Sequence, residues 1–201
     1  ARSEIDAAGK VVLPGVVDSH FHLGIFRPFA EDAEVETASA IAGGVTTILA
    51  YHRAGRNNLF DDVRPELPGS YLEIFAQLLD RARGHFRTDY GFNLAPVTKQ
   101  HVNEVPELVR GHGVTTFKYY MHYRGVDPSV YQPGRDEKEY VFSDTGYDLG
   151  HLHDLMRQVA SVNQEGGTAR VSIHAEHPGI IREHTRATKD QLGTLRGETP
   201  L

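Results

Sequence analysis

Two histidines separated by one residue, His20 and His22, are the strongest chemical feature of the sequence. They follow Val11 to Val17, a run of apolar and β-branched residues that predicts a strand. Because side chains alternate across a strand, residues i and i+2 face the same side, and both imidazoles could bind one metal ion. An isolated pair of this kind is more often two ordinary polar residues at the end of a strand, so its context has to decide.

A second pair with the same spacing, His151 and His153, has a different setting. It lies among apolar residues that recur with helical spacing: Leu149, Leu152, Leu155, Met156 and Val159. On a helix, residues i and i+2 do not face each other. We therefore assign this second pair to a solvated helix face.

Lys118 interrupts the run from Val114 to Met121, which predicts a buried central strand. A buried ammonium is costly unless it is neutralised, and burial lowers the pKa of a lysine and exposes a nucleophilic amine. Such an amine can react with CO2 to form a carbamate, whose carboxylate-like group could bridge two cations. The alternative is a lysine that reaches solvent at the end of its strand, and the residue alone favours neither.

His174 ends the last predicted strand, Ala169 to His174, and could supply a further imidazole. The commoner role of a lone histidine is that of a hydrogen-bonded core residue. Glu176 and His177, which follow it closely, are weaker candidates for a metal ligand.

The elements that position these residues follow from the alternation of β-branched runs with amphipathic segments, which is typical of βα units on a parallel sheet. A helix is predicted over 71–82 because its apolar residues recur at i, i+3, i+4 and i+7. Further strands are predicted at 45–50, 89–96, 114–123 and 169–174. About five βα units result, whereas a closed barrel has eight in about 250 residues. We therefore expect an α/β fold, a partial (β/α)8 TIM-type barrel. The polar stretches 53–70 and 126–148 are candidate active-site loops.

Composition narrows the choice of partners and ligands. The 21 Lys and Arg against 27 Asp and Glu give a net charge of −6, and no basic cluster forms the surface that a nucleic acid needs. No apolar run approaches the roughly 20 residues of a membrane span. Because the chain has no cysteine, thiolate ligands are excluded, and metal ligands must be His, Asp, Glu or Lys.

Several segments, in register and covering nearly the whole chain, resemble the cyclic amidohydrolases, and in particular the dihydropyrimidinase and D-hydantoinase branch. They are residues 14–22, 36–47, 89–93, 106–108, 113–118, 123–125 and 174–176. The resemblance implies that residues 11–201 are the N-terminal part of the catalytic barrel. Residues 1–10 would be a remnant leading from a small flanking β-sandwich domain that is otherwise missing.

The resemblance also implies a binuclear metal hydrolase that opens a cyclic amide ring. His20 and His22 would hold one divalent ion, usually zinc in this family, carboxylated Lys118 would bridge two ions, and His174 would bind the second. A hydroxide shared by the ions would attack the ring carbonyl. Tyr123, five residues after the bridging lysine, would donate a hydrogen bond to the developing oxyanion. Members of the family assemble as homo-tetramers, usually in the cytoplasm.

The sequence also departs from the family pattern. The family takes another metal-binding histidine and a late aspartate from strands beyond the fifth, and no residue here matches them. The chain is then either a fragment of a longer one or is completed by a partner; we favour a fragment, which we expect to be inactive alone. Gly24 occupies the position where dihydroorotases place an arginine. A hydantoin, a dihydropyrimidine or a cyclic ureide such as allantoin is therefore favoured as substrate. The competing hypothesis is a non-enzymatic scaffold protein related to dihydropyrimidinases.

Overall fold

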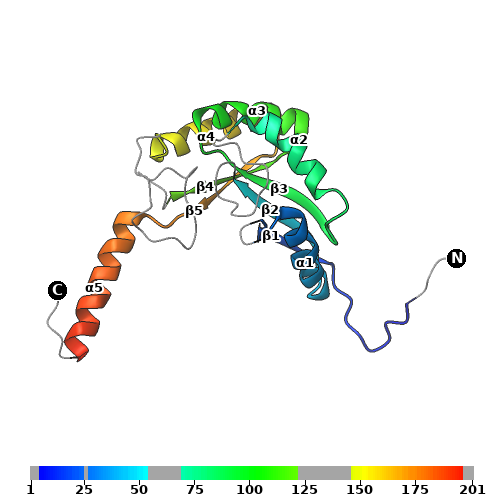
Figure 1. The fold of residues 1–201 in the computed structure, drawn as a ribbon, viewed down its shortest axis with the longest axis horizontal. Helices are drawn as coiled ribbons and strands as arrows, with labels where there is room; N and C mark the ends of the chain where they lie inside the picture. The colour runs from blue at the N-terminus through cyan, green and yellow to red at the C-terminus, as the bar shows by residue number, and fades with distance from the viewer. Residues whose placement is uncertain (1–4, 25–26, 54–68, 122–145, 197–201) are drawn as a thin grey trace.

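The structure, a computed structural model, describes residues 5–24, 27–53, 69–121 and 146–196. Within these residues, five parallel strands alternate with five helices and form a half-barrel (Figure 1). In chain order the elements are β1 (Val16–His22), α1 (Phe29–Ala42), β2 (Val45–Arg53), α2 (Tyr71–Ala82), β3 (Asp89–Ala95), α3 (Lys99–His112), β4 (Thr116–Tyr120), α4 (Leu149–Gln164), β5 (Arg170–His174) and α5 (Pro178–Arg196). The expectation of about five βα units from a TIM-type barrel is confirmed.

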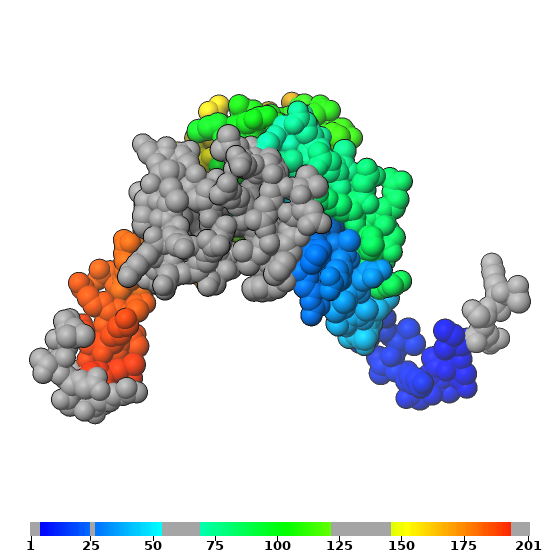
Figure 2. Space-filling view, viewed as in Figure 1, coloured from blue at the N-terminus to red at the C-terminus, as the bar shows by residue number. Residues whose placement is uncertain are grey.

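The strands lie in the sheet in the order of the chain, β1-β2-β3-β4-β5, and each pairs in parallel with the next. Successive parallel strands need a crossover connection, and here each crossover contains a helix. Helices α2, α3 and α4 lie together along one side of the sheet (Figure 1), with α1 against α2 and β2. Helix α5 projects away from this body (Figure 2). Across the described ranges, no helix is long and apolar enough to cross a bilayer.

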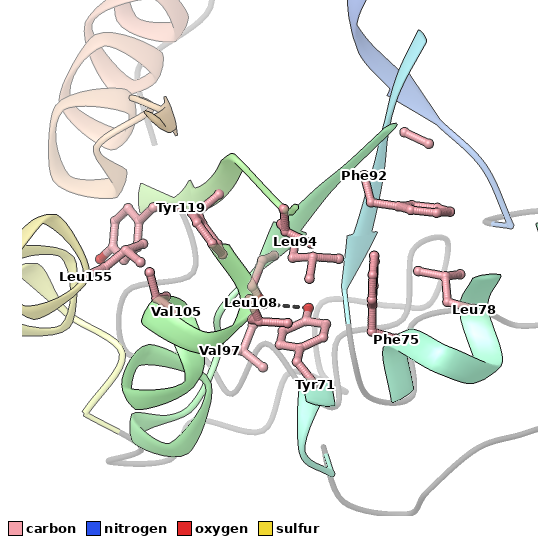
Figure 3. Close-up of a cluster of buried hydrophobic side chains, with 14 of the residues drawn as sticks. Tyr71, Phe75, Leu78, Phe92, Leu94, Val97, Val105, Leu108, Tyr119 and Leu155 are labelled. Carbon is pink, nitrogen blue, oxygen red and sulfur yellow. Dashed lines mark hydrogen bonds between the residues drawn. The ribbon is translucent and has the colours of Figure 1, made fainter. Parts of the chain in front are cut away.

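The side of the sheet that faces the helices forms the hydrophobic core. Figure 3 shows Tyr71 and Phe75 of α2 packed with Phe92 and Leu94 of β3, beside Leu108 of α3. The predicted apolar stripe of the helix over 71–82 is buried at Tyr71, Phe75, Leu78 and Ala82, while Leu79 is partly exposed. Because strand residues alternate between the two sides, the same strands present their other residues to the open inner face of the half-barrel.

The first strand begins later than the sequence suggests. Val11 to Leu13 are exposed and belong to no strand, and β1 starts at Val16. Among the described residues, β1 pairs with β2 alone; β2 begins at Val45, the partner of Val16, so within this part of the chain no strand lies beside the residues before Val16. Of the predicted strand 114–123, β4 spans Thr116–Tyr120, while residues 122–123 lie outside the described residues. The proposed boundary at residue 10 stays a prediction.

The assignment of His151 and His153 to a solvated helix face is wrong for His151. Its side chain is 1% exposed, its ring packs against the ring of Tyr147, and its Nε2 donates to the carbonyl of Pro96 at 2.8 Å. The physical reason is that His151 lies four residues before Leu155 on α4 and shares its buried face. His153 is exposed, as predicted.

Candidate metal centre

The metal-ligand candidates His20 and His22 end β1 and lie on the same side of it. Their ring centroids are 5.2 Å apart. Both rings contact Tyr51 of β2, at centroid distances of 4.6 Å for His20 and 5.0 Å for His22. The strand thus brings the two imidazoles together, as side-chain alternation predicts.

A cavity of about 370 Å³ opens on the inner face of the half-barrel beside this pair. All five strands contribute to its lining, which includes His20, Tyr51, Asn93, Lys118, Ser172 and His174. Three of the four predicted metal ligands therefore face one cavity, and the fourth, His22, lies beside His20. Tyr123 lies outside the described residues, as do 54–68 and 126–145 of the two predicted loops.

Lys118 is buried, with 2% of its surface exposed. Its Nζ lies 4.6 Å from the ring centroid of Tyr51 and 5.3 Å from that of Tyr120. Within the described part of the chain, no carboxylate forms an ion pair with it, and burial lowers its pKa. Lys118 therefore does not reach solvent, which was the alternative that the sequence left open.

The histidines are in a state that suits metal binding. Burial lowers the pKa of His22 to about 4, and the positive charges of His20, Lys118 and His174 act in the same direction. Burial also lowers the pKa of His20, helped by Lys118 and His174 and opposed by Asp18. Both imidazoles are thus neutral near pH 7, with a nitrogen lone pair available. The Nε2 of His174 lies 3.0 Å from a carboxylate oxygen of Glu176.

No three His, Cys, Asp or Glu side chains among the described residues lie close enough to hold a metal ion by themselves. The side chains around the cavity nevertheless suit a metal ion. Two neutral imidazoles are paired, and a third imidazole and a buried amine without a counter-charge face the adjoining cavity. Carboxylation of that amine would add an anion with two oxygen ligands, which is what the cluster lacks.

Comparison with known proteins identifies relatives of this chain. No family model matches the chain. A D-hydantoinase of Streptomyces coelicolor is 34% identical over 184 residues, which are 88% of this chain and 32% of that protein. A dihydropyrimidinase of Dictyostelium discoideum is 32% identical over 186 residues, or 89% of this chain and 30% of that protein. The solved D-hydantoinase of Bacillus sp. AR9 superimposes with a TM-score of 0.59 at 25% identity, covering 99% of this chain and 36% of that one.

The chain belongs to the dihydropyrimidinase and D-hydantoinase family. It spans about a third of the length of the relatives it matches. The resemblance seen in the sequence is thereby confirmed, and the half-barrel corresponds to part of the D-hydantoinase fold. The roles of single residues stay predictions.

The structure also places at the candidate metal centre three residues that the sequence alone does not single out. Tyr51 packs against both histidines of β1, and Asn93 and Ser172 line the cavity. Ser172 lies two residues before His174 on the same strand, but Tyr51 lies beyond the predicted strand 45–50 and Asn93 is not on the face counted back from residue 96, so the pairing of the strands is needed to place them. Gly24 has a positive φ of 74°, a conformation that favours glycine over an arginine at this position.

Proposed function

We propose that this chain carries the front part of the catalytic barrel of a metal-dependent hydrolase that opens cyclic amides of the hydantoin or dihydropyrimidine type. One observation carries the proposal: buried Lys118 has no counter-charge among the described residues and shares a cavity with His20 and His174. A buried unpaired ammonium is strongly disfavoured. Conversion to a carbamate removes that positive charge and creates a metal ligand.

The residues have separate parts in this proposal. His20 and His22 would hold one divalent ion, most simply zinc, carboxylated Lys118 would join it to a second ion, and His174 would bind the second. When bound, such ions supply water activation near neutral pH. Tyr51 packs edge-on against His20 and limits the rotation of its ring. Tyr123 is proposed to donate a hydrogen bond to the developing oxyanion.

The wider properties of the protein rest on family membership alone. We propose that the activity needs the full-length natural chain, and that this chain forms a homo-oligomer in the cytoplasm. Allantoin and other cyclic ureides are the alternative substrates. A scaffold without catalytic activity is the alternative function, and it predicts a protein that binds no metal at this centre.

The test is metal content and ring-opening activity of the full-length natural chain, produced with added bicarbonate. We expect about two divalent ions per chain and hydrolysis of a hydantoin or a dihydropyrimidine. Lys118→Ala should lose the metal and the activity. Lys99→Ala is the matched control, because Lys99 is an exposed lysine paired with Asp154, and it should keep both. A metal-free, inactive full-length protein would contradict the proposal and favour the scaffold.

A further inference from the structure

Asn93 is a buried polar residue in the cavity to which the proposed mechanism gives no role. It lies on β3, is 2% exposed and lines the cavity beside Lys118. Its Oδ1 accepts no hydrogen bond from any residue that the structure describes. Buried acceptors are nearly always satisfied in folded proteins, so an open one at a functional cavity points to a missing donor.

The orientation of the Asn93 amide follows from its neighbours. Ser172 Oγ donates to the carbonyl of Phe117 at 3.3 Å, which uses the one proton of that hydroxyl. Towards Asn93 the hydroxyl can therefore only accept, and the group that faces it at 3.1 Å must be the NH2. These two bonds assign the NH2 to the side of the amide that faces Ser172 and leave Oδ1 as the open atom.

Asn93 and Lys118 line the same cavity, and the strand register brings their side chains near each other. Asn93 reaches from β3 to Ser172 on β5, and Ser172 is the register partner of Lys118 on the strand between them. In the other direction, Lys118 reaches from β4 to the ring of Tyr51 on β2, and Tyr51 is the register partner of Asn93. The two side chains therefore cross on the inner face of the half-barrel.

Carboxylation of a lysine creates a donor that needs such an acceptor. The neutral amine attacks CO2: a bond forms between Nζ and carbon, one carbon–oxygen π bond opens onto oxygen, and one N–H proton passes to solvent water. The product is a carbamate anion with one remaining N–H. Its nitrogen lone pair is conjugated with the carboxylate, so this nitrogen donates and does not accept. In a buried site the N–H has to find a partner within the protein.

We propose that Asn93 Oδ1 accepts a hydrogen bond from the Nζ–H of carboxylated Lys118. Asn93 is then a positioning residue, which stabilises the modified lysine and holds the carbamate in one rotational state. Ser172 fixes the Asn93 amide from the other side. This inference rests on the proposed function, because it requires that Lys118 is carboxylated.

The experiment measures carboxylation directly. The full-length chain is stripped of metal and reconstituted with zinc at increasing concentrations of 13C-labelled bicarbonate, and the carbamate 13C signal is followed by NMR. Asn93→Leu removes the acceptor at similar volume. We expect it to need roughly tenfold more bicarbonate for half-carboxylation, as one buried hydrogen bond implies.

Thr116→Val is the matched control, because Thr116 lines the same cavity but its hydroxyl already donates to the carbonyl of Phe92. It should carboxylate like the wild type. If Asn93→Leu also does so, the inference is wrong and the proposed function stands. If Asn93→Leu keeps the carbamate but raises only KM, Asn93 contacts substrate instead and the inference is again wrong. A wild type with no carbamate signal at any bicarbonate concentration overturns the proposed function itself.

A measurement on the wild type covers the case in which Asn93→Leu does not fold. With 15N-lysine labelling, the single Nζ–H of the carbamate can be observed by NMR. A hydrogen bond to Asn93 slows its exchange with solvent well below that of a free lysine carbamate. Exchange as fast as in the free carbamate would overturn the inference.

Discussion

The chain contains two His-x-His pairs that differ only in the element that carries them. His20 and His22 lie on β1, on the same side, with their rings 5.2 Å apart beside a cavity. His151 and His153 lie on α4, where one ring is buried in the core and the other is exposed. The different periodicities of strand and helix therefore distinguish a pair of histidines that could bind one metal ion from a pair that cannot.

The hydrogen bonds of the ring nitrogens likewise distinguish structural histidines from candidate metal ligands. His151 Nε2 donates to Pro96, and His101 Nδ1 accepts from the N–H of Val97, while its Nε2 donates to Gly69. These two histidines hold the backbone that follows β3 from opposite sides. Rings occupied in this way are structural, whereas the rings of His20 and His22 form no hydrogen bond with any residue that the structure describes.

The largest expected effect concerns the strand pair. His20→Asn or His22→Asn should weaken zinc binding by well over a hundredfold, because changes in residues that only support metal ligands already cost about 10–100-fold. The variants should fold like the wild type, since neither ring fills the core. Zinc affinity of the full-length chain is measured by competition with a chelator. Unchanged affinity in both variants would contradict the assignment of this pair as ligands.

A stability effect of about 2–3 kcal/mol is expected from the helix pair. His151→Ala removes a buried ring and leaves the carbonyl of Pro96 without its donor. Denaturant unfolding of the metal-free full-length chain gives the change in the free energy of unfolding. Zinc affinity, once the protein is folded, should stay within a few-fold of the wild type. A loss of zinc binding comparable to that of His22→Asn would instead link this helix to the metal centre.

The sequence was sufficient for those features that depend on periodicity within one element. It predicted the helix over Tyr71–Ala82 and the five alternating units, because the apolar pattern of a helix or strand lies within one short segment of the sequence. It failed at Val11 to Leu13, which have the composition of a strand but pair with no strand that the structure describes. Pairing depends on residues far along the chain, and local composition does not report it.

The candidate site shows the same division. The common side of His20 and His22 follows from strand alternation, but Asn93 and Ser172 are unremarkable in the sequence and gain their meaning only from the register of β3, β4 and β5. His151 was missed because the helical stripe was read from apolar residues alone. A histidine four residues before Leu155 occupies that stripe as well, and its polar nitrogen is satisfied by a backbone carbonyl on another element.

A smaller effect is expected from acidification of the metal-free protein. Burial lowers the pKa of His101, opposed by the Gly69 carbonyl and Glu104, and lowers that of His151, opposed by Pro96, Asp154 and Asp148. The unfolded chain takes up these protons near pH 6.5, before the folded chain does. The metal-free protein should therefore keep its full stability above that pH and lose it as the pH falls towards the lowered pKa values.

The loss can reach about 1.4 kcal/mol per pH unit for each histidine that is protonated only in the unfolded chain. Unfolding free energies measured between pH 7.5 and 5 test it, with His101→Gln as the comparison. The variant is less stable at pH 7.5, but its stability should fall less steeply with acidification, because one of the histidines with a lowered pKa is gone. Identical slopes for variant and wild type would show that His101 does not contribute.

The smallest effect is expected at the exposed member of the helix pair. The side chain of His153 is 70% exposed, and its Nδ1 lies 3.9 Å from a carboxylate oxygen of Asp154, a surface contact of little energetic value. His153→Ala should change the free energy of unfolding by less than about 0.5 kcal/mol. Measured beside His151→Ala under the same conditions, it isolates burial as the cause, since both variants remove a histidine from the same helix two residues apart. A loss at His153 as large as that at His151 would mean that the two faces of α4 are not divided into core and solvent as the structure describes.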